Sequence, residues 1–436
     1  MNLTGKTVVV YGAGVSGISA AQLVRDMGGR AVIYDDNPKK SHSTSNTAVF
    51  RDCDIVVTSP GVRSDNELLL EARLAGKQVI GELEFASLFC AAEQIAVTGT
   101  NGKTTAVMLI DRILKCAHVP SHVVGNIGTA FSAVADKLDA METAVIEASS
   151  FQLEGMRFFA PDIAVMLNIT PDHLDRHGSM ERYIGAKANV FLRQAESDFA
   201  VYNADDPNVL SLEPVMRARK VPFSLTRPVD GAYLSSGFVC FRGKPVVSVE
   251  DIDMSGRELE DVLAAVAVAA VKGVSFYAMS SALASFRRPE YRREECGSVG
   301  GVKVFNDSKA TNVFSTVSAA ESMTGDTVLI LGGADRGEDF DELFASLPRT
   351  VKGAVVTGEN AEKIASAARE HGFAPLSESP TIADACADAV ELARMLDCGN
   401  VLFSPASKSY DRYSSFVERG RAFDAAVRRL SDGEKG

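Results

Sequence analysis

Short apolar runs suited to buried strands alternate with helix-like stretches along almost the whole chain. The first run, at 7–11, is followed by a glycine-rich loop and a helix-like stretch at 16–27, and a similar unit starts at 94–98. Because parallel strands need a crossover between them, this alternation predicts parallel sheets covered by helices. The length of 436 residues predicts about three domains.

The alternating pattern divides into three units. The first closes with a short strand at 78–80 and a helix that ends near Cys90, and the second restarts at 94–98. Arg287-Arg288-Pro289 is typical of a hinge, because proline is tolerated poorly inside helices and sheets. Between 221 and 249, short runs punctuated by glycine and proline predict a small antiparallel patch.

Bulk properties exclude several classes of function. A net charge of -12 argues against nucleic acid as a partner, because phosphate backbones need a concentrated basic surface. The seven cysteines are scattered without a C-x-x-C pair, which favours a reducing compartment. No run approaches the ~18 apolar residues of a membrane span. We therefore expect a cytoplasmic protein without membrane insertion.

The second unit opens with a phosphate-binding loop, Gly99-Thr-Asn-Gly102-Lys103-Thr104-Thr105, placed between a strand and a helix. Glycines let the backbone curl around phosphate oxygens, Lys103 can reach the outer phosphates, and Thr104 can ligate Mg²⁺. The spacing is not the usual one, because Val97 stands where the first glycine is expected. A glycine turn with a surface lysine is the alternative, but the flanking strand and helix favour a nucleoside triphosphate site.

The first unit carries a similar loop, Gly12-Ala-Gly14-Val-Ser-Gly17, followed by Asp35 at the end of the next strand. Alone, this matches the dinucleotide-binding fingerprint and suggests a nicotinamide oxidoreductase. A hydride-transfer enzyme would leave the second phosphate loop without a role. A nucleoside diphosphate that is part of the substrate accounts for both loops.

Further motifs follow in a fixed order over nearly the whole chain, and the chain resembles the Mur ligases. These motifs are Gly125-Asn-Ile-Gly128, Glu147-Ala-Ser-Ser-Phe-Gln-Leu-Glu154, Asn168-Ile-Thr-Pro-Asp-His-Leu-Asp-Arg-His177, Lys187, Asn203-Ala-Asp-Asp206, Asn306-Asp-Ser-Lys-Ala-Thr-Asn312, Leu331-Gly-Gly-Ala-Asp-Arg-Gly337 and Ser404-Pro-Ala-Ser-Lys-Ser-Tyr-Asp411.

The resemblance implies an α/β protein of three domains. A Rossmann-like domain at 1–90 would bind a UDP-sugar, and a P-loop ATPase-like domain at 91–288 would bind ATP. A second Rossmann-like domain at 289–436 would close over ATP and the amino acid. In the implied reaction, ATP phosphorylates the alanyl carboxylate of UDP-N-acetylmuramoyl-L-alanine, and the amine of D-glutamate attacks the acyl phosphate. We expect a monomer with two Mg²⁺ sites.

The resemblance also assigns residues to each site. The catalytic residues would be Lys103, Glu147, His173 and Lys187. The ATP-binding residues would be Gly99, Asn101, Gly102, Lys103, Thr104, Thr105, Asp261, Arg292 and Asp307. The UDP-sugar site would use Val15, Ser16, Asp35, Asp36, Gly61 and Asn126. D-glutamate would meet Lys309, Thr311, Arg336, Ser409 and Phe416. The metal ligands would be Thr104, Glu147, His173 and a carbamoylated Lys187.

Two of these assignments compete with simpler interpretations. Lys187 alone would be taken for a surface charge, and carbamoylation requires a neutral amine, which a lowered pKa would supply. His173 and His177 have the i, i+4 spacing of a zinc pair, but with no third ligand evident we expect a solvated helix pair and no role for His177.

Departures from the family pattern leave alternatives open. Asp261 stands where an asparagine is expected, and Tyr291-Arg292 replaces a His-Arg pair. An aspartate cannot donate as an amide does, so adenine recognition would be altered. The alternatives are a Mur ligase that adds another amino acid and a catalytically weak homologue that binds a UDP-sugar.

Overall fold

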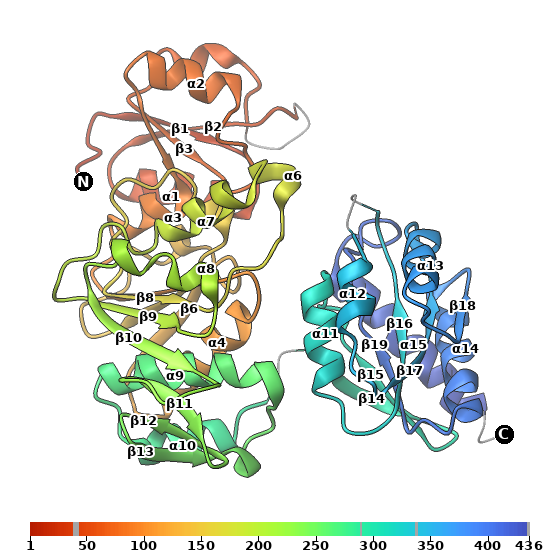
Figure 1. Ribbon diagram of the computed structural model, residues 1–436. Coiled ribbons are helices and arrows are strands. Elements are labelled where there is room, and N and C mark those ends of the chain that lie inside the picture. Colours follow the sequence, from red (N-terminus) through yellow and green to blue (C-terminus); the bar gives the residue numbers. More distant parts are fainter. Residues whose placement is uncertain (38–42, 288–289, 336–338, 434–436) are drawn as a thin grey trace. The chain divides into compact units, whose positions relative to one another are not determined.

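The computed structural model describes residues 1–37, 43–287, 290–335 and 339–433, and these form two compact units (Figure 1). The first unit comprises Met1–Met254 and Leu259–Phe286, and the second comprises Ser255–Glu258 and Arg287–Gly436. The mixed α/β class with mostly parallel sheets is as predicted. Within the part of the chain that the structure describes, no helix combines the length and apolar character needed to cross a membrane.

The first unit begins with a four-stranded parallel sheet of order β2-β1-β3-β4. Its strands consist largely of valine, isoleucine and tyrosine with buried side chains, as expected for a sheet covered on both faces. The strands are β1 (Thr7–Tyr11), β2 (Arg30–Tyr34), β3 (Ile55–Thr58) and β4 (Gln78–Gly81), with helices α1 (Val15–Asp26), η1 (Thr47–Phe50), α2 (Glu67–Leu74) and α3 (Glu82–Ser87).

A nine-stranded sheet of order β13-β12-β11-β10-β9-β8-β5-β7-β6 completes the first unit. Pairing is parallel from β6 to β11 and antiparallel in β11–β13, so the expected antiparallel patch is confirmed, except that β10 pairs in parallel. The strands are β5 (Glu93–Thr98), β6 (Ser121–Gly125), β7 (Thr143–Glu147), β8 (Ile163–Met166), β9 (Phe199–Asn203), β10 (Arg219–Ser224), β11 (Ala232–Ser235), β12 (Phe238–Phe241) and β13 (Lys244–Ser248).

Helices cover this sheet on both faces, and two separate buried clusters include residues of its strands. The buried cluster on one face includes residues of α4, α9 and α10. The helices and turns are α4 (Lys103–Cys116), η2 (Phe131–Ala133), α5 (Ser150–Leu153), α6 (Leu174–His177), α7 (Met180–Ala188), α8 (Pro207–Leu210), η3 (Glu213–Val215), η4 (Val249–Asp251), α9 (Leu259–Val271) and α10 (Phe276–Ala284).

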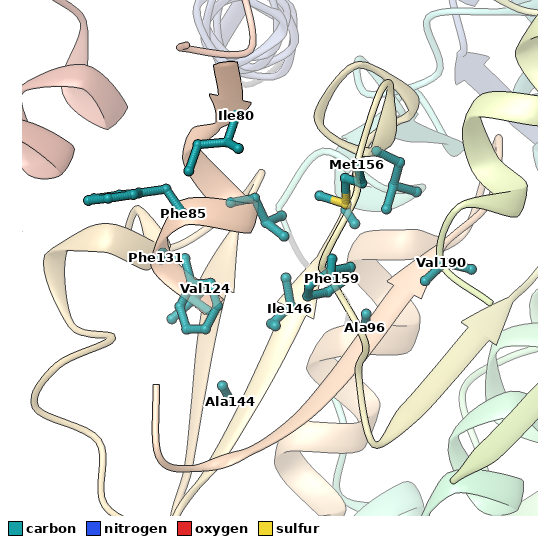
Figure 2. Close-up of a cluster of buried hydrophobic side chains, with 14 of the residues drawn as sticks. Ile80, Phe85, Ala96, Val124, Phe131, Ala144, Ile146, Met156, Phe159 and Val190 are labelled. Carbon is teal, nitrogen blue, oxygen red and sulfur yellow. The ribbon is translucent and has the colours of Figure 1, made fainter. Parts of the chain in front are cut away.

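One hydrophobic core joins the two sheets of the first unit (Figure 2). Ile80 and Phe85 from the first sheet region belong to the same buried cluster as Phe131, Ile146 and Phe159 from the second. Burying a large apolar side chain contributes about 1.5–3 kcal/mol. The first glycine-rich loop and the phosphate loop therefore belong to sheets that share one packed core.

The second unit is built on a six-stranded sheet of order β14-β15-β19-β16-β17-β18, in which only the β14–β15 pair is antiparallel within the described residues. Its elements are η5 (Gly256–Glu258), β14 (Glu294–Val299), β15 (Val302–Asn306), α11 (Val313–Glu321), β16 (Thr327–Leu331), α12 (Asp341–Ser346), β17 (Val351–Val356), α13 (Ala361–Glu370), β18 (Leu376–Glu378), α14 (Ile382–Met395), β19 (Asn400–Phe403) and α15 (Phe416–Gly433).

A short segment from the middle of the chain belongs to this second unit. Within Ser255–Glu258, Arg257 pairs with Glu321 and Glu258 pairs with Arg293. The chain therefore passes between the units three times. The hinge expected at 287–289 falls largely outside the described residues, since 288 and 289 are not among them.

Candidate functional site

The phosphate loop lies between β5 and α4, where sequence reasoning placed it. Gly99 and Gly102 have φ values of 157° and 83°, which favour glycine over other residues. A Cβ on Gly99 would lie 2.9 Å from the Cβ of Leu167, and one on Gly102 would collide with the carboxylate of Asp261. The glycines thus permit a close turn at the N-terminus of a helix, where the dipole favours anions.

Glu147 ends β7 and is held beside this loop by two side chains. Its Oε2 accepts a hydrogen bond from Thr104 Oγ1 at 2.9 Å, and its Oε1 accepts one from Asn126 Nδ2 at 2.7 Å. Hydroxyl and carboxylate oxygens at the carboxyl end of a parallel strand fit the preferences of Mg²⁺. Asn126 was predicted to bind the UDP-sugar. In the structure it also orients the carboxylate of Glu147, which was predicted to bind the metal.

Two lysines converge on one backbone carbonyl of the loop. Lys103 Nζ donates to Gly99 O at 2.8 Å and to Thr100 O at 2.7 Å, and Lys187 Nζ donates to Gly99 O at 2.6 Å. Lys187 is 1% exposed, so it is not a surface charge. Burial, followed by repulsion from Lys103, holds the pKa of Lys187 well below its ordinary value. A lowered pKa favours the neutral form of the Lys187 amine, which carbamoylation requires.

His173 lies at the start of α6, with the left-handed backbone angle φ 56°. Its ring is 4.8 Å from that of Phe151, and its side chain is 29% exposed. The expectation that His177 is solvated is wrong. His177 is buried, and its Nε2 lies 3.0 Å from Ser150 Oγ. Among the described residues, no three histidine, cysteine, aspartate or glutamate side chains cluster in a way suited to a metal.

The first glycine-rich loop requires glycine where its backbone packs tightly. Gly12 has φ 106°, and a Cβ on Gly17 would collide with the carbonyl oxygen of Gly12. Asp35 accepts a hydrogen bond from Ala13 N at 2.7 Å. The loop therefore leads directly into the N-terminus of α1, with a carboxylate fixed at the tip of β2.

The remaining predicted residues of the UDP-sugar site line the same edge of the first sheet. Asp36 accepts hydrogen bonds from Tyr11 OH at 2.7 Å and Tyr34 OH at 3.1 Å. Val15 and Gly61 are exposed, while Ser16 is half-buried. A pocket lined by residues of β3, β4 and α5 opens beside this edge.

Several predicted residues belong to the second unit and are positioned there by its own contacts. Lys309 Nζ lies 4.0 Å from the centre of the Phe416 ring, and Ser409 is buried. Asp307 accepts a hydrogen bond from Ser404 Oγ at 2.7 Å. Burial raises the pKa of Asp307 to about 7, against the opposing effect of that hydrogen bond and of Arg292.

Three other predicted residues are Thr311, Thr105 and Arg336. Thr311 is half-buried just before α11, and Thr105 is buried in the first turn of α4. Arg336 lies outside the described residues.

Sequence reasoning missed residues that fix the phosphate loop in the first unit and a buried arginine in the second unit. Asn168 Oδ1 accepts from Asn101 N at 2.9 Å, and Tyr183 OH lies 3.0 Å from Thr100 Oγ1. Arg419, buried in the second unit, donates to Ser407 O at 2.9 Å and Ser308 O at 2.8 Å. Asn168 is the first residue of a motif named in the sequence analysis, which ends at His177. Nothing in the local sequence pattern distinguishes Tyr183 or Arg419.

The family models and the relatives that match this chain all belong to one family. Residues 97–237 match the Mur ligase middle domain, and residues 287–406 match the Mur ligase, glutamate ligase domain. The UDP-N-acetylmuramoylalanine--D-glutamate ligase of Halalkalibacterium halodurans is 37% identical, with 98% of each chain covered. The protein of the same name from Geobacillus sp. is 38% identical, also with 98% of each chain covered.

Two solved structures share the fold. The UDP-N-acetylmuramate-alanine ligase of Thermotoga maritima gives a TM-score of 0.61 at 19% identity, covering 97% of this chain and 99% of that one. The MurF ligase of Thermotoga maritima in complex with ADP gives 0.62 at 17% identity, covering 98% and 96%.

Proposed function

Because the chain belongs to the Mur ligase family, we propose that it is an ATP-dependent ligase of peptidoglycan precursor synthesis. It joins the amine of D-glutamate to the alanyl carboxylate of UDP-N-acetylmuramoyl-L-alanine, with release of ADP and phosphate. Its relatives of that name match over 98% of both chains. The observation that carries the proposal is the hydrogen bond from Thr104 Oγ1, in the phosphate loop, to the carboxylate of Glu147.

The loop suits the transfer of a phosphoryl group to a carboxylate. The N-terminus of α4 and the glycine turn bind phosphate oxygens, and Lys103 turns from the loop carbonyls toward the transferring phosphate. Two anions must approach each other in this step, so cationic groups stabilise the transition state. Attack of the D-glutamate amine on the acyl phosphate then expels phosphate and leaves the amide.

Mg²⁺ would be held by Thr104, Glu147, His173 and a carbamoylated Lys187. When bound, the metal supplies positive charge that screens the phosphate oxygens. Thr104 and Glu147 already lie within hydrogen-bond distance of each other, and Asn126 fixes the second carboxylate oxygen. The buried Lys187, with its lowered pKa, is suited to react with CO₂ as a neutral amine.

The first unit would bind the UDP-sugar along the edge that carries Gly12, Asp35 and Asp36, with the diphosphate at the N-terminus of α1. The second unit would bind D-glutamate through Lys309, Thr311, Arg336, Ser409 and Phe416. In that unit the Phe416 ring already holds the Lys309 ammonium, and a cation so placed suits a dicarboxylate substrate. Arg292, Asp307 and Asp261 would complete the ATP site, and the protein would act as a monomer in the cytoplasm.

Phosphate release tests the proposal directly. The protein is incubated with ATP, Mg²⁺ and UDP-N-acetylmuramoyl-L-alanine against a panel of amino acids, and release is expected with D-glutamate. Release with a different amino acid alone would refute the specificity. No release with any amino acid would favour a UDP-sugar-binding protein.

A lysine pair on the same helix gives a matched control for the loop. Lys103→Ala should abolish turnover and leave UDP-sugar binding largely unchanged. Lys115→Ala should keep turnover, because Lys115 is exposed at the far end of α4 and pairs with Asp111 on the surface. Near-normal turnover in Lys103→Ala would contradict the role of the phosphate loop.

A further inference from the structure

His173 sits in a backbone conformation that its own helix cannot enforce. Its φ of 56° is left-handed, which costs a residue other than glycine about 1–2 kcal/mol. The following helix, α6, has only four residues and is capped at its C-terminus by Gly178 with φ 78°. So short a helix is not stable by itself, and contacts from elsewhere must therefore hold His173 in place.

His177 supplies the deepest of these contacts. It is 4% exposed, and its Nε2 lies 3.0 Å from Ser150 Oγ. Its ring is stacked on that of Phe151, with centres 5.4 Å apart and an interplanar angle of 27°. The centre of its ring also lies 5.2 Å from that of the Tyr183 ring. A single buried side chain thus anchors the C-terminal end of α6.

Phe151 connects this anchor to His173. The His173 ring lies 4.8 Å from Phe151, and Arg176 Cζ lies 4.0 Å from the centre of the same ring. Residues four apart on a helix share a face, so the imidazoles of His173 and His177 both pack on Phe151. A shift of His177 therefore displaces the surface on which His173 rests.

The anchor also connects to the two other parts of the site. Ser150 and Phe151 follow Glu147 by three and four residues, at the start of α5. Tyr183 bonds Thr100 of the phosphate loop and lies under Lys187 Nζ at 4.8 Å. His177 thus contacts the segments that carry Glu147, His173 and Lys187.

We infer that His177 is a positioning residue, which fixes His173 through the Phe151 ring and fixes α6 through Ser150. This inference rests on the proposed role of His173 as a metal ligand. A histidine meets both requirements at once, because its ring stacks on Phe151 while its nitrogen bonds a hydroxyl. His177→Phe keeps the ring and loses the bond to Ser150, whereas His177→Ala loses both.

The test combines kinetics with a spectroscopic probe of the metal. His177→Ala should lower kcat by about 10- to 100-fold, as expected when a ligand is displaced by about 1 Å. It should raise the Mg²⁺ concentration for half-maximal rate and change KM for UDP-N-acetylmuramoyl-L-alanine little. The kcat of His177→Phe should lie between those of His177→Ala and the wild type, and a cooperative thermal transition shows that its fold is intact. His122→Ala, at a half-buried histidine paired with Glu142 outside the site, is the matched control.

Mn²⁺ bound in place of Mg²⁺, with a non-hydrolysable ATP analogue and UDP-N-acetylmuramoyl-L-alanine, gives a readout independent of turnover. Electron spin-echo modulation should detect imidazole nitrogen on Mn²⁺ in the wild type and lose it in His173→Ala and His177→Ala. Wild-type nitrogen modulation and Mg²⁺ dependence in His177→Ala would overturn the inference. No nitrogen modulation in the wild type would remove the metal role of His173, and this inference with it, while D-glutamate-dependent phosphate release would still support the ligase activity.

Discussion

Asp307 gives a pH-dependent stability that can be worked out from the structure. Asp307 follows β15 and is 7% exposed, and its carboxyl accepts hydrogen bonds from Ser404 Oγ and from Arg293 N. Burial nevertheless raises its pKa to about 7. Since the unfolded chain would titrate near 3.9, the folded state holds a proton that the unfolded state has lost between about pH 4 and pH 7.

Stability must therefore fall as pH rises through this window. A difference of about three between the folded and unfolded pKa values costs about 4 kcal/mol once the pH is above both. Most of it, about 3 kcal/mol, is lost between about pH 5 and pH 8. Asn is similar in shape and does not titrate, so Asp307→Asn should not lose stability as the pH rises. At about pH 8 the variant should therefore be more stable than the wild type.

Hydrogen exchange of β19 amides reports this difference locally, because β19 is central in the sheet of the second unit and pairs with β15. Wild type and variant are compared at each pH, so that the intrinsic exchange rates cancel. The protection of the variant relative to the wild type should grow as pH rises. A constant ratio from pH 5 to pH 8 would refute the buried, protonated carboxyl.

Three other substitutions test further parts of the structure. Gly17→Ala should lower the melting temperature because its Cβ would collide with Gly12 O, whereas Gly14→Ala, with open space around its Cβ, should not; equal melting temperatures would contradict the tight turn. Lys187→Ala should lose turnover that short carboxylic acids partly restore, and a folded variant without such rescue would argue against carbamoylation. Glu84→Ala should cost about 1–3 kcal/mol in urea unfolding, because the backbone N–H groups of residues 157–159, one of them buried, lose their acceptor; a loss below about 1 kcal/mol would show that water replaces the carboxylate.

The strands were predictable because each is a local apolar run. β1, β4 and β5 begin and end within about one residue of the expected positions. The attachment of Ser255–Glu258 to the second unit was not predictable. It depends on the pairing of Glu258 with Arg293, 35 residues further along the chain, which no local pattern encodes.

At the site, residue type and position were readable while partners were not. The roles of the loop glycines, Lys103 and Thr104 could be predicted from the strand–loop–helix pattern, because neighbouring residues in the sequence determine that geometry. The burial of His177 was missed, because its neighbours Ser150 and Phe151 come from another segment. The same holds for Glu84, which accepts hydrogen bonds from the backbone of residues 157–159.

The convergence of two lysines on Gly99 O explains why the site suits a modified Lys187. Two ammonium groups at one carbonyl repel each other, and burial adds to the cost for Lys187. Loss of a proton from Lys187 removes the repulsion and leaves Lys103 as the cation. Carbamoylation would then place a negative group beside Lys103, and the repulsion would become attraction. The same change would free Gly99 O and give Lys187 the oxygen that a metal ligand needs, so a single modification would both relieve the buried charge and complete the proposed metal site.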